Sequence, residues 1–240
     1  LRVEGSVFLI GVACPGRMSF ATAQIGGQLA LHGATVGPLT AQGARIGASV
    51  HLRAHEGHPF EALGEVSLAG AEIGGQLACD GARFINPGKI ALNLQRGRVA
   101  GDVFLRPQGS LPFRSEGELH LSGAAIGGQL DLAGAQLSNP AGHALFAPRM
   151  QVGAEFFWQD VKVEAGTVHL PSAHVGDLVD DLDSWPADGR TYIDGFTYER
   201  ITRNAPVDAT RRIAWLARCA TQGKGFQPQP FTHCAAVLAR

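Results

Sequence analysis

Hydrophobic and polar positions alternate over short stretches of this chain, and one such stretch recurs along its length. Its seven positions read apolar, any, small, any, apolar, any, apolar, which is typical of a β-strand with one buried face. The copies begin at Val3, Ile25, Ile46, Ile73, Val99, Ile126, Val152 and, in degraded form, Val175. The steps between them are nearly constant, at 22, 21, 27, 26, 27, 26 and 23 residues. This spacing predicts an internal repeat whose copies stack on one another.

The repeat also has a longer period that spans two copies. The pentamer Ile-Gly-Gly-Gln-Leu begins at Ile25, Ile73 and Ile126, which are the second, fourth and sixth copies. A longer segment that starts at Gly64 closely matches the one that starts at Gly117. We therefore predict that the full unit is a pair of coils, about 43–53 residues long.

Coils of this length predict an all-β fold, a right-handed β-helix (β-solenoid) of about eight coils. Stacking would place the first, fifth and seventh positions of every copy in one continuous apolar interior. The third position is small, as in Gly5, Gly27 and Ala48, which permits a bend or a close backbone approach. The two ends of such a stack are open edges that must be capped.

Three segments are expected along the chain. The β-solenoid covers residues 1–183 and ends where the inward seventh position becomes Asp181. An exit or linker segment covers 184–204. A short α-helical cap covers 205–240, with one helix over Ala209–Ala220 and a second that begins at Pro230. Because the chain starts inside a repeat and stops inside a helix, we expect it to be part of a longer protein whose C-terminal region begins here.

The composition argues against nucleic-acid binding, a membrane span and a zinc or redox site built from Cys pairs. Charged residues make up only 17% of the chain and the net charge is −1, which argues against nucleic acid as a partner. No apolar run approaches the roughly 18 residues of a membrane span. The four cysteines, Cys14, Cys79, Cys219 and Cys234, are widely scattered, without the C-x-x-C spacing of zinc or redox sites.

The C-terminal residues carry a resemblance to a known family. The motifs are the Ile-Gly-Gly-Gln-Leu repeats, Trp185-Pro186, Asp194-Gly195-Phe196-x-Tyr198, Arg212-x-x-Trp215-Leu216-x-Arg218 and Phe226-x-Pro228-Gln229-Pro230-Phe231. Together they resemble bacterial, actinomycete-type β-helix repeat proteins that are often labelled membrane-associated oxidoreductase. The Leu-x-Gly-Ala pieces also resemble pentapeptide repeats. The resemblance implies a membrane-spanning region beyond this chain and a place on the cytoplasmic side of the membrane, and it supplies no catalytic residues.

Candidate chemical groups are better interpreted as structural ones. The Gly-Gly pairs lie inside strand repeats and not in the strand-to-helix turn of a dinucleotide site, so no cofactor is expected. His51, His55 and His58 lack a partner at metal-ligand spacing and indicate a polar loop. Cys79 occupies an inward position and is expected in the core. An acidic group is either a calcium site or, as we prefer, a solvated exit turn, and consists of Asp177, Asp180, Asp181, Asp183, Asp188 and Asp194.

The sixth position of the repeat points outward and is aromatic or imidazole-bearing in alternate coils. These residues predict an interaction stripe on one outer wall, with rings about 10 Å apart, formed by Phe8, His51, Phe104 and Phe157. The stripe would dock a protein partner or another part of the same polypeptide. The alternative is that the longer loops after these coils fold over the rings.

The leading hypothesis is therefore a non-catalytic β-solenoid that serves as a scaffold or interaction domain of a membrane-associated bacterial protein. The alternatives are an oxidoreductase, as the family label suggests, or a carbohydrate-active β-helix enzyme. A third hypothesis is a filament formed by end-to-end stacking, against which the expected cap argues.

Overall fold

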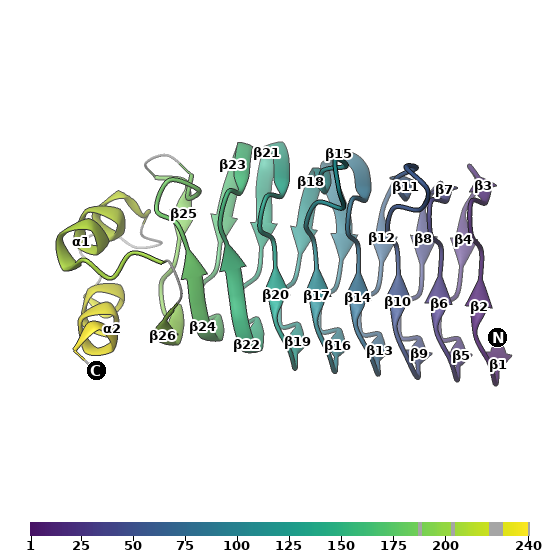
Figure 1. Ribbon diagram of the computed structural model, residues 1–240, viewed down its shortest axis with the longest axis horizontal. Coiled ribbons are helices and arrows are strands. Elements are labelled where there is room, and N and C mark those ends of the chain that lie inside the picture. Colours follow the sequence, from purple (N-terminus) through teal and green to yellow (C-terminus); the bar gives the residue numbers. More distant parts are fainter. Residues whose placement is uncertain (187–188, 203–204, 221–227, 240) are drawn as a thin grey trace.

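The copies of the sequence repeat stack in register along the whole length of the protein. The computed structural model describes residues 1–186, 189–202, 205–220 and 228–239. The first position of each copy pairs in parallel with the same position of the next, in the order Val3, Ile25, Ile46, Ile73, Val99, Ile126, Val152 and Val175. Figure 1 shows the resulting turns side by side along the long axis. The predicted β-solenoid of about eight coils is confirmed.

The strands belong to two sheets that share the turns. A 15-stranded sheet contains β1 (Arg2–Val3), β2 (Val7–Phe8), β5 (Gln24–Ile25), β6 (Leu29–Ala30), β9 (Arg45–Ile46), β10 (Val50–His51), β13 (Glu72–Ile73), β14 (Leu77–Ala78), β16 (Arg98–Val99), β17 (Val103–Phe104), β19 (Ala125–Ile126), β20 (Leu130–Asp131), β22 (Gln151–Trp158), β24 (His174–Asp180) and β26 (Thr197–Ile201). An 11-stranded sheet contains β3 (Ala13–Cys14), β4 (Met18–Ser19), β7 (Thr35–Val36), β8 (Leu39–Thr40), β11 (Glu61–Leu63), β12 (Val66–Ser67), β15 (Arg83–Asn93), β18 (Arg114–His120), β21 (Gln136–Phe146), β23 (Lys162–His169) and β25 (Thr191–Tyr192).

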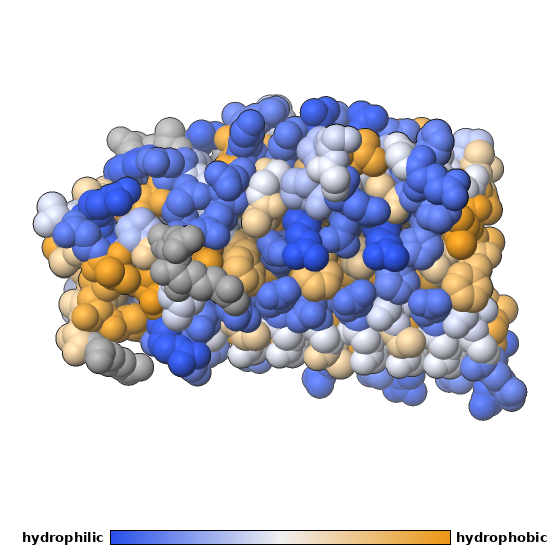
Figure 2. Space-filling view, viewed as in Figure 1, coloured by the Kyte–Doolittle hydropathy of each residue, from blue (hydrophilic) through white to orange (hydrophobic). Residues whose placement is uncertain are grey.

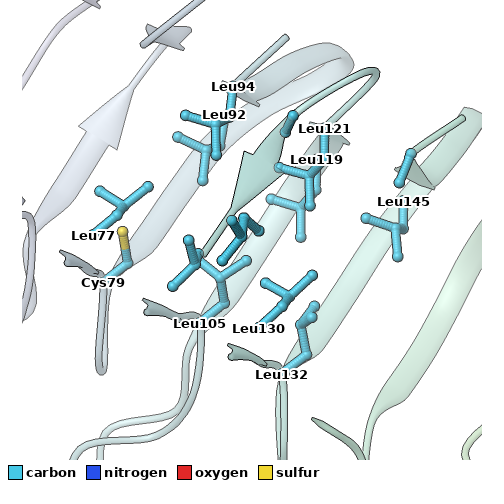
Figure 3. Packing of buried hydrophobic residues seen from close by; sticks show 14 of the residues in the cluster. Leu77, Cys79, Leu92, Leu94, Leu105, Leu119, Leu121, Leu130, Leu132 and Leu145 are labelled. Carbon is cyan, nitrogen blue, oxygen red and sulfur yellow. The ribbon is translucent and has the colours of Figure 1, made fainter. Parts of the chain in front are cut away.

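The interior of the solenoid is a continuous column of apolar side chains. Figure 3 shows Leu77, Leu105 and Leu130 on one side of this interior, facing leucines of the second sheet such as Leu92 and Leu119. All five are fully buried. The fifth and seventh positions of the repeat thus lie over their counterparts in the neighbouring turns, and removal of this apolar surface from water is the main source of stability.

The second position of the repeat is glycine in most turns because the turns approach each other closely there. A Cβ atom on Gly26, Gly47 or Gly74 would lie well inside van der Waals contact with a backbone carbonyl oxygen of the preceding turn. A larger residue would crowd the preceding turn, although the methyl group of Ala100 is accommodated in the fifth turn. Stacking therefore favours glycine at this position.

The two-turn period has a hydrogen-bonding cause at the fourth position. In the first, third and fifth turns this position carries Ser or Asp, whose side-chain oxygen accepts the backbone N–H of the glutamine in the next turn. The pairs are Gln28 N to Ser6 Oγ (3.1 Å), Gln76 N to Ser49 Oγ (3.2 Å) and Gln129 N to Asp102 Oδ1 (2.9 Å). A Cβ at the third position of the even turn, for example on Gly75, would collide with that oxygen. The third position of odd turns has no such oxygen beneath it, so Ala48 is tolerated.

The parallel stack continues beyond Asp183, where the sequence pattern indicated its end. Within the segment expected as an exit or linker, β25 pairs with β23 and β26 pairs with β24. Tyr198 stacks on Val175 at the first position of the repeat and is buried. The pattern hides this turn because its first position is aromatic and its fifth is Thr202.

The inward polar residue of the preceding turn is Asp180, and the expectation that Asp181 points inward is wrong. The register between β22 and β24 shifts after Val152, so that Trp158 lies opposite Asp180. Asp180 is fully buried, whereas Asp181 is half-buried. The irregularity shortens the turn by one residue, which a count along the sequence does not reveal.

Two helices, α1 (Ala209–Arg218) and α2 (Gln229–Leu238), cover the last turn (Figure 1). The Gln229 side chain accepts a hydrogen bond from the backbone N–H of Gly195 at 2.9 Å. His233 Nε2 lies 3.0 Å from both the backbone nitrogen and the backbone oxygen of Tyr198. Side chains of α2 thus occupy backbone groups of the terminal strand that would otherwise be an open edge. Gly195, Tyr198 and Gln229 in these contacts belong to the C-terminal motifs described above.

Candidate functional site

A long groove lies on one edge of the solenoid. Its volume is about 1250 Å³, and it follows the row of strands β1, β5, β9, β13, β16 and β19 along the lower edge in Figure 1. The first seven turns each contribute the first position of the repeat and the residues on either side, and the eighth contributes His174 and Gly176. The groove therefore extends from the first turn at Arg2 to the last at Glu199.

The floor of the groove is built from the second position of the repeat. Gly26, Gly47, Gly74, Gly127 and Gly153 are all exposed there. The close stacking that favours glycine also removes every side chain from this line. Ala100 replaces glycine in the fifth turn and is likewise exposed, so a side chain is tolerated at that one central point.

The wall of the groove is a ladder of mostly polar side chains from the position that precedes the repeat. In order of the turns, the ladder reads Arg2, Gln24, Arg45, Glu72, Arg98, Ala125, Gln151 and His174. Figure 2 shows hydrophilic side chains that project from this lower edge, beneath a paler row.

One ion pair is formed within this wall. Arg45 Nε lies 3.1 Å from Glu72 Oε2, and the side chains are 68% and 56% exposed. Such an exposed pair contributes about 0–1 kcal/mol, because both groups remain hydrated and mobile. A ligand can therefore compete for these charges at little cost.

Sequence reasoning missed the groove. Its signal is present, because an exposed, usually polar residue precedes the first position and a glycine follows it in most turns. From sequence, this glycine was considered only as part of the Gly-Gly pairs that were compared with a dinucleotide-binding turn. The consequence, a bare floor beside a polar wall, becomes apparent once the turns are placed over one another.

The predicted interaction stripe does form a single outward column. The sixth positions pair in the order Phe8, Ala30, His51, Ala78, Phe104, Asp131 and Phe157. Phe8 is 56% exposed, whereas the other three members of the stripe are half-buried and the residues between the rings are buried. The rings thus share a wall, but only Phe8 presents most of its surface to solvent.

Neighbouring polar side chains cover part of the column. The Arg106 guanidinium lies over the Phe104 ring, 4.2 Å from its centroid. It also donates hydrogen bonds to Asp80 at 2.9 Å and to Asp131 at 2.8 Å. This agrees with the alternative interpretation, in which residues after these coils fold over the rings. Docking of a partner on the stripe stays a prediction.

Two histidines at this wall, His32 and His51, form a stacked pair. The rings of His32 and His51 are stacked with centroids 5.2 Å apart, and Arg53 Nε donates to His32 Nδ1 at 3.2 Å. Burial, with the nearby charge of Arg53, lowers the pKa of His32 to about 4. His55 and His58 pair through their backbones in the following loop.

The acidic group is dispersed into separate structural contacts. Asp180 pairs with Arg212 and Asp177 with Arg200. Asp181 accepts hydrogen bonds from the backbone of Asp160 and from Ser184, whereas Asp183 is exposed. Asp188 lies outside the described residues, and Asp194 lies in the turn before β26. In the part of the chain that the structure describes, no three His, Cys, Asp or Glu side chains are grouped to hold a metal ion.

The four cysteines are all free. Cys79 is fully buried in the core, as predicted, and burial raises the pKa of its thiol well above the ordinary value. Burial also raises the pKa of Cys219 to about 12. Neither thiol is ionised near neutral pH, so neither is a ready nucleophile.

Neither a membrane-spanning helix nor a similar known protein gives further information on this site. No helix among the described residues is long and apolar enough to cross a membrane. No protein-family model, curated protein or solved structure matches the chain.

Proposed function

We propose that this β-solenoid is a non-catalytic interaction domain, a scaffold that holds an extended polypeptide in its groove. The polypeptide belongs to a partner protein or to another part of the same protein. The observation that carries the proposal is the continuity of the groove, since the same three positions of seven successive turns line it, from Arg2 to Gly153.

The dimensions favour a linear ligand. Neighbouring strands lie about 4.8 Å apart, so eight stacked turns extend over roughly 35–40 Å. Small-molecule sites are enclosed clefts of about 300–1,000 Å³ that surround their ligand. This groove is larger and lies open along its whole length, which suits a chain that binds by many small contacts.

The rigidity of the solenoid supports the same function. Every turn is fixed by parallel ladders to the turns on either side, and the exposed floor is bare backbone at glycine. The surface is therefore organised before a ligand arrives, which reduces the entropy lost on binding. The arginine and glutamine side chains of the wall offer hydrogen-bond donors to an extended chain.

The test is to fill the groove at its centre without touching the stacking glycines. Ala100→Tyr places a large side chain on the floor, and Gln95→Tyr makes the same change at an exposed position outside the groove. Random peptides are selected by display on the unmodified chain, and each binder is then measured on both variants.

The proposal expects a class of binders that Ala100→Tyr abolishes and Gln95→Tyr leaves unchanged. Circular dichroism and the thermal midpoint establish that both variants fold. If the selected peptides bind all three proteins equally, or if selection yields none that depends on the groove, groove binding is wrong.

Membrane association remains a further part of the proposal and is supported by the sequence resemblance alone. Fractionation of the full-length protein in its native cell is the direct test. Recovery with the membrane fraction, lost on removal of the region that follows this chain, is the expected result. Recovery only in the soluble fraction contradicts it.

A further inference from the structure

Arginines occur at alternate turns of the groove wall. From this spacing we propose that the bound polypeptide is in the polyproline II conformation, with an acidic side chain at every third residue. The inference rests on the proposed function and specifies its ligand.

The two repeat lengths agree closely. Arg2, Arg45 and Arg98 occupy the first, third and fifth places in the ladder of parallel pairs. Two turns of the solenoid measure about 9.6 Å. A polyproline II helix has three residues per turn and a rise of 3.1 Å each, so every third residue returns to the same side after about 9.3 Å. The accumulated difference over both intervals is about 0.6 Å, which a flexible arginine absorbs.

Other regular conformations match less well. In an extended β-strand, same-side residues are about 6.7 Å apart, and residues three apart point to opposite sides. In an α-helix, one side repeats after seven residues or about 10.5 Å, so the error over two intervals reaches roughly 2 Å. A helix is also about 10–12 Å wide with its side chains and cannot lie flat against the floor.

Carboxylates are the side chains that suit these three points. The guanidinium group offers paired donors whose geometry matches a carboxylate. Arg45 already contacts the Glu72 carboxylate through a single donor, Nε, at 3.1 Å. A ligand carboxylate would replace that exposed and weak contact.

Glu72 sets the spacing that is tolerated. It lies between Arg45 and Arg98 in the wall, paired in register with both. A ligand with an acidic residue opposite this turn would place two carboxylates together, which is unfavourable. The polyproline II chain instead presents backbone groups there. These groups have no internal hydrogen-bond partners. Glu72 can accept the N–H of a residue other than proline, and Gln24, which lies between Arg2 and Arg45 in the wall, can donate to a carbonyl oxygen.

The experiment uses synthetic peptides and the chain as it stands. Binding of a blocked peptide with the repeat Pro-Pro-Glu is measured by calorimetry against the same peptide with Pro-Pro-Gln. A third peptide carries the same number of glutamates in a Pro-Glu repeat. We expect the Pro-Pro-Glu peptide to bind roughly tenfold or more tightly than the Pro-Pro-Gln peptide, with the difference falling as salt is raised.

Substitutions in the wall locate the contact. Arg45→Gln and Arg98→Gln should each weaken Pro-Pro-Glu binding roughly two- to fivefold. Arg114→Gln, which removes an exposed arginine from a different wall, should leave it unchanged. Glu72→Gln should selectively improve binding of the Pro-Glu peptide, because the repelling carboxylate is gone.

Three results would overturn the inference. Equal binding of the Pro-Pro-Glu peptide and either control peptide, lost in Ala100→Tyr, would refute the carboxylate contacts (Pro-Pro-Gln) or their spacing (Pro-Glu) while leaving groove binding intact. Equal weakening by Arg114→Gln would show unspecific charge attraction. Displacement of the peptide by an acidic oligosaccharide that binds more tightly, and that is equally sensitive to Arg98→Gln, would assign the groove to a carbohydrate.

Discussion

Asp180 and Arg212 form a fully buried ion pair that joins the last turns of the solenoid to helix α1. Arg212 Nη2 donates to Asp180 Oδ1 at 2.6 Å, and Nη1 donates to Oδ2 at 2.8 Å. Trp185 Nε1 adds a third donor to the carboxylate at 2.8 Å, and the remaining Nε of Arg212 donates to the Pro206 carbonyl. The polar atoms of the pair are thus satisfied inside the protein, and neither side chain is exposed.

Removal of one partner should be costly. Arg212→Met leaves the Asp180 carboxylate buried without its counter-charge, for which we expect a loss of about 3–5 kcal/mol in the stability of the cap. Arg211→Met, at the exposed neighbouring residue, is the matched control. Urea unfolding monitored by tryptophan fluorescence checks the prediction, because Trp185 donates to Asp180 and packs against Trp215 with ring centroids 5.2 Å apart. Similar midpoints for both variants would contradict it.

Loss of the α2 side chains that cover β26 should make the protein self-associate. The double variant Gln229→Ala and His233→Ala frees backbone groups of Gly195 and Tyr198, and an open strand edge is a template for pairing with another chain. Light scattering should show a mass that rises with concentration. Thr232→Ala, at an exposed site on the same helix, should stay unchanged in mass, and a double variant that behaves like it would exclude this role for α2.

The glycine at the second repeat position should resist even the smallest enlargement. Gly74→Ala forces a methyl group against the Gly47 carbonyl, and we expect it to cost about 1–3 kcal/mol. Gly5→Ala, in the first turn, meets no atom within contact range and should be neutral. Thermal midpoints of the two variants provide the comparison, and equal values would mean that the turns separate more easily than the stacking implies.

The stability of the solenoid should decrease in mild acid through His32. Its pKa is near 6.5 in the unfolded chain and about 4 in the fold, so the unfolded chain binds more protons between these values. The contribution is therefore fully present above about pH 6.5 and lost as the pH falls towards 4. His51, stacked on it, also has a pKa below the ordinary value because of burial, and it acts in the same direction.

Unfolding midpoints across this range provide the measurement. His32→Gln should flatten the dependence on pH, whereas His58→Gln, in the exposed loop, should preserve it. An unchanged slope in the first variant would show that other groups control the acid response.

The stacking of the turns could be predicted from the sequence, because the apolar positions that recur in the repeat are the ones that must be buried when the turns stack. Each of the eight predicted first positions lies over the next, and Cys79 occupies the core place that its position in the repeat assigned. The last turn was missed because Tyr198 fills a place that aliphatic residues fill elsewhere. The inward role of Asp180 depends on a register shift, which exists only in three dimensions.

The candidate site was less accessible from sequence than the fold. The aromatic column was placed correctly on one wall, but the cover provided by Arg106 depends on its ion pairs with Asp80 and Asp131 in adjacent turns. The floor of the groove exists because glycine at the second position has no side chain. Its wall is formed by residues such as Arg45 and Arg98, which lie far apart in sequence. Such a surface becomes visible only after the turns are in register.

The alternation of Ser or Asp turns with Gly-Gln turns restricts how such a protein can change in length during evolution. If the turn that contains Gln28 were deleted, Ser6 would lie beneath Ala48, where its hydroxyl would meet a methyl group in place of Gly27. Insertion of one turn would create the same mismatch at its boundary. Within the first six turns, duplications and deletions that preserve this pairing therefore add or remove two turns at once.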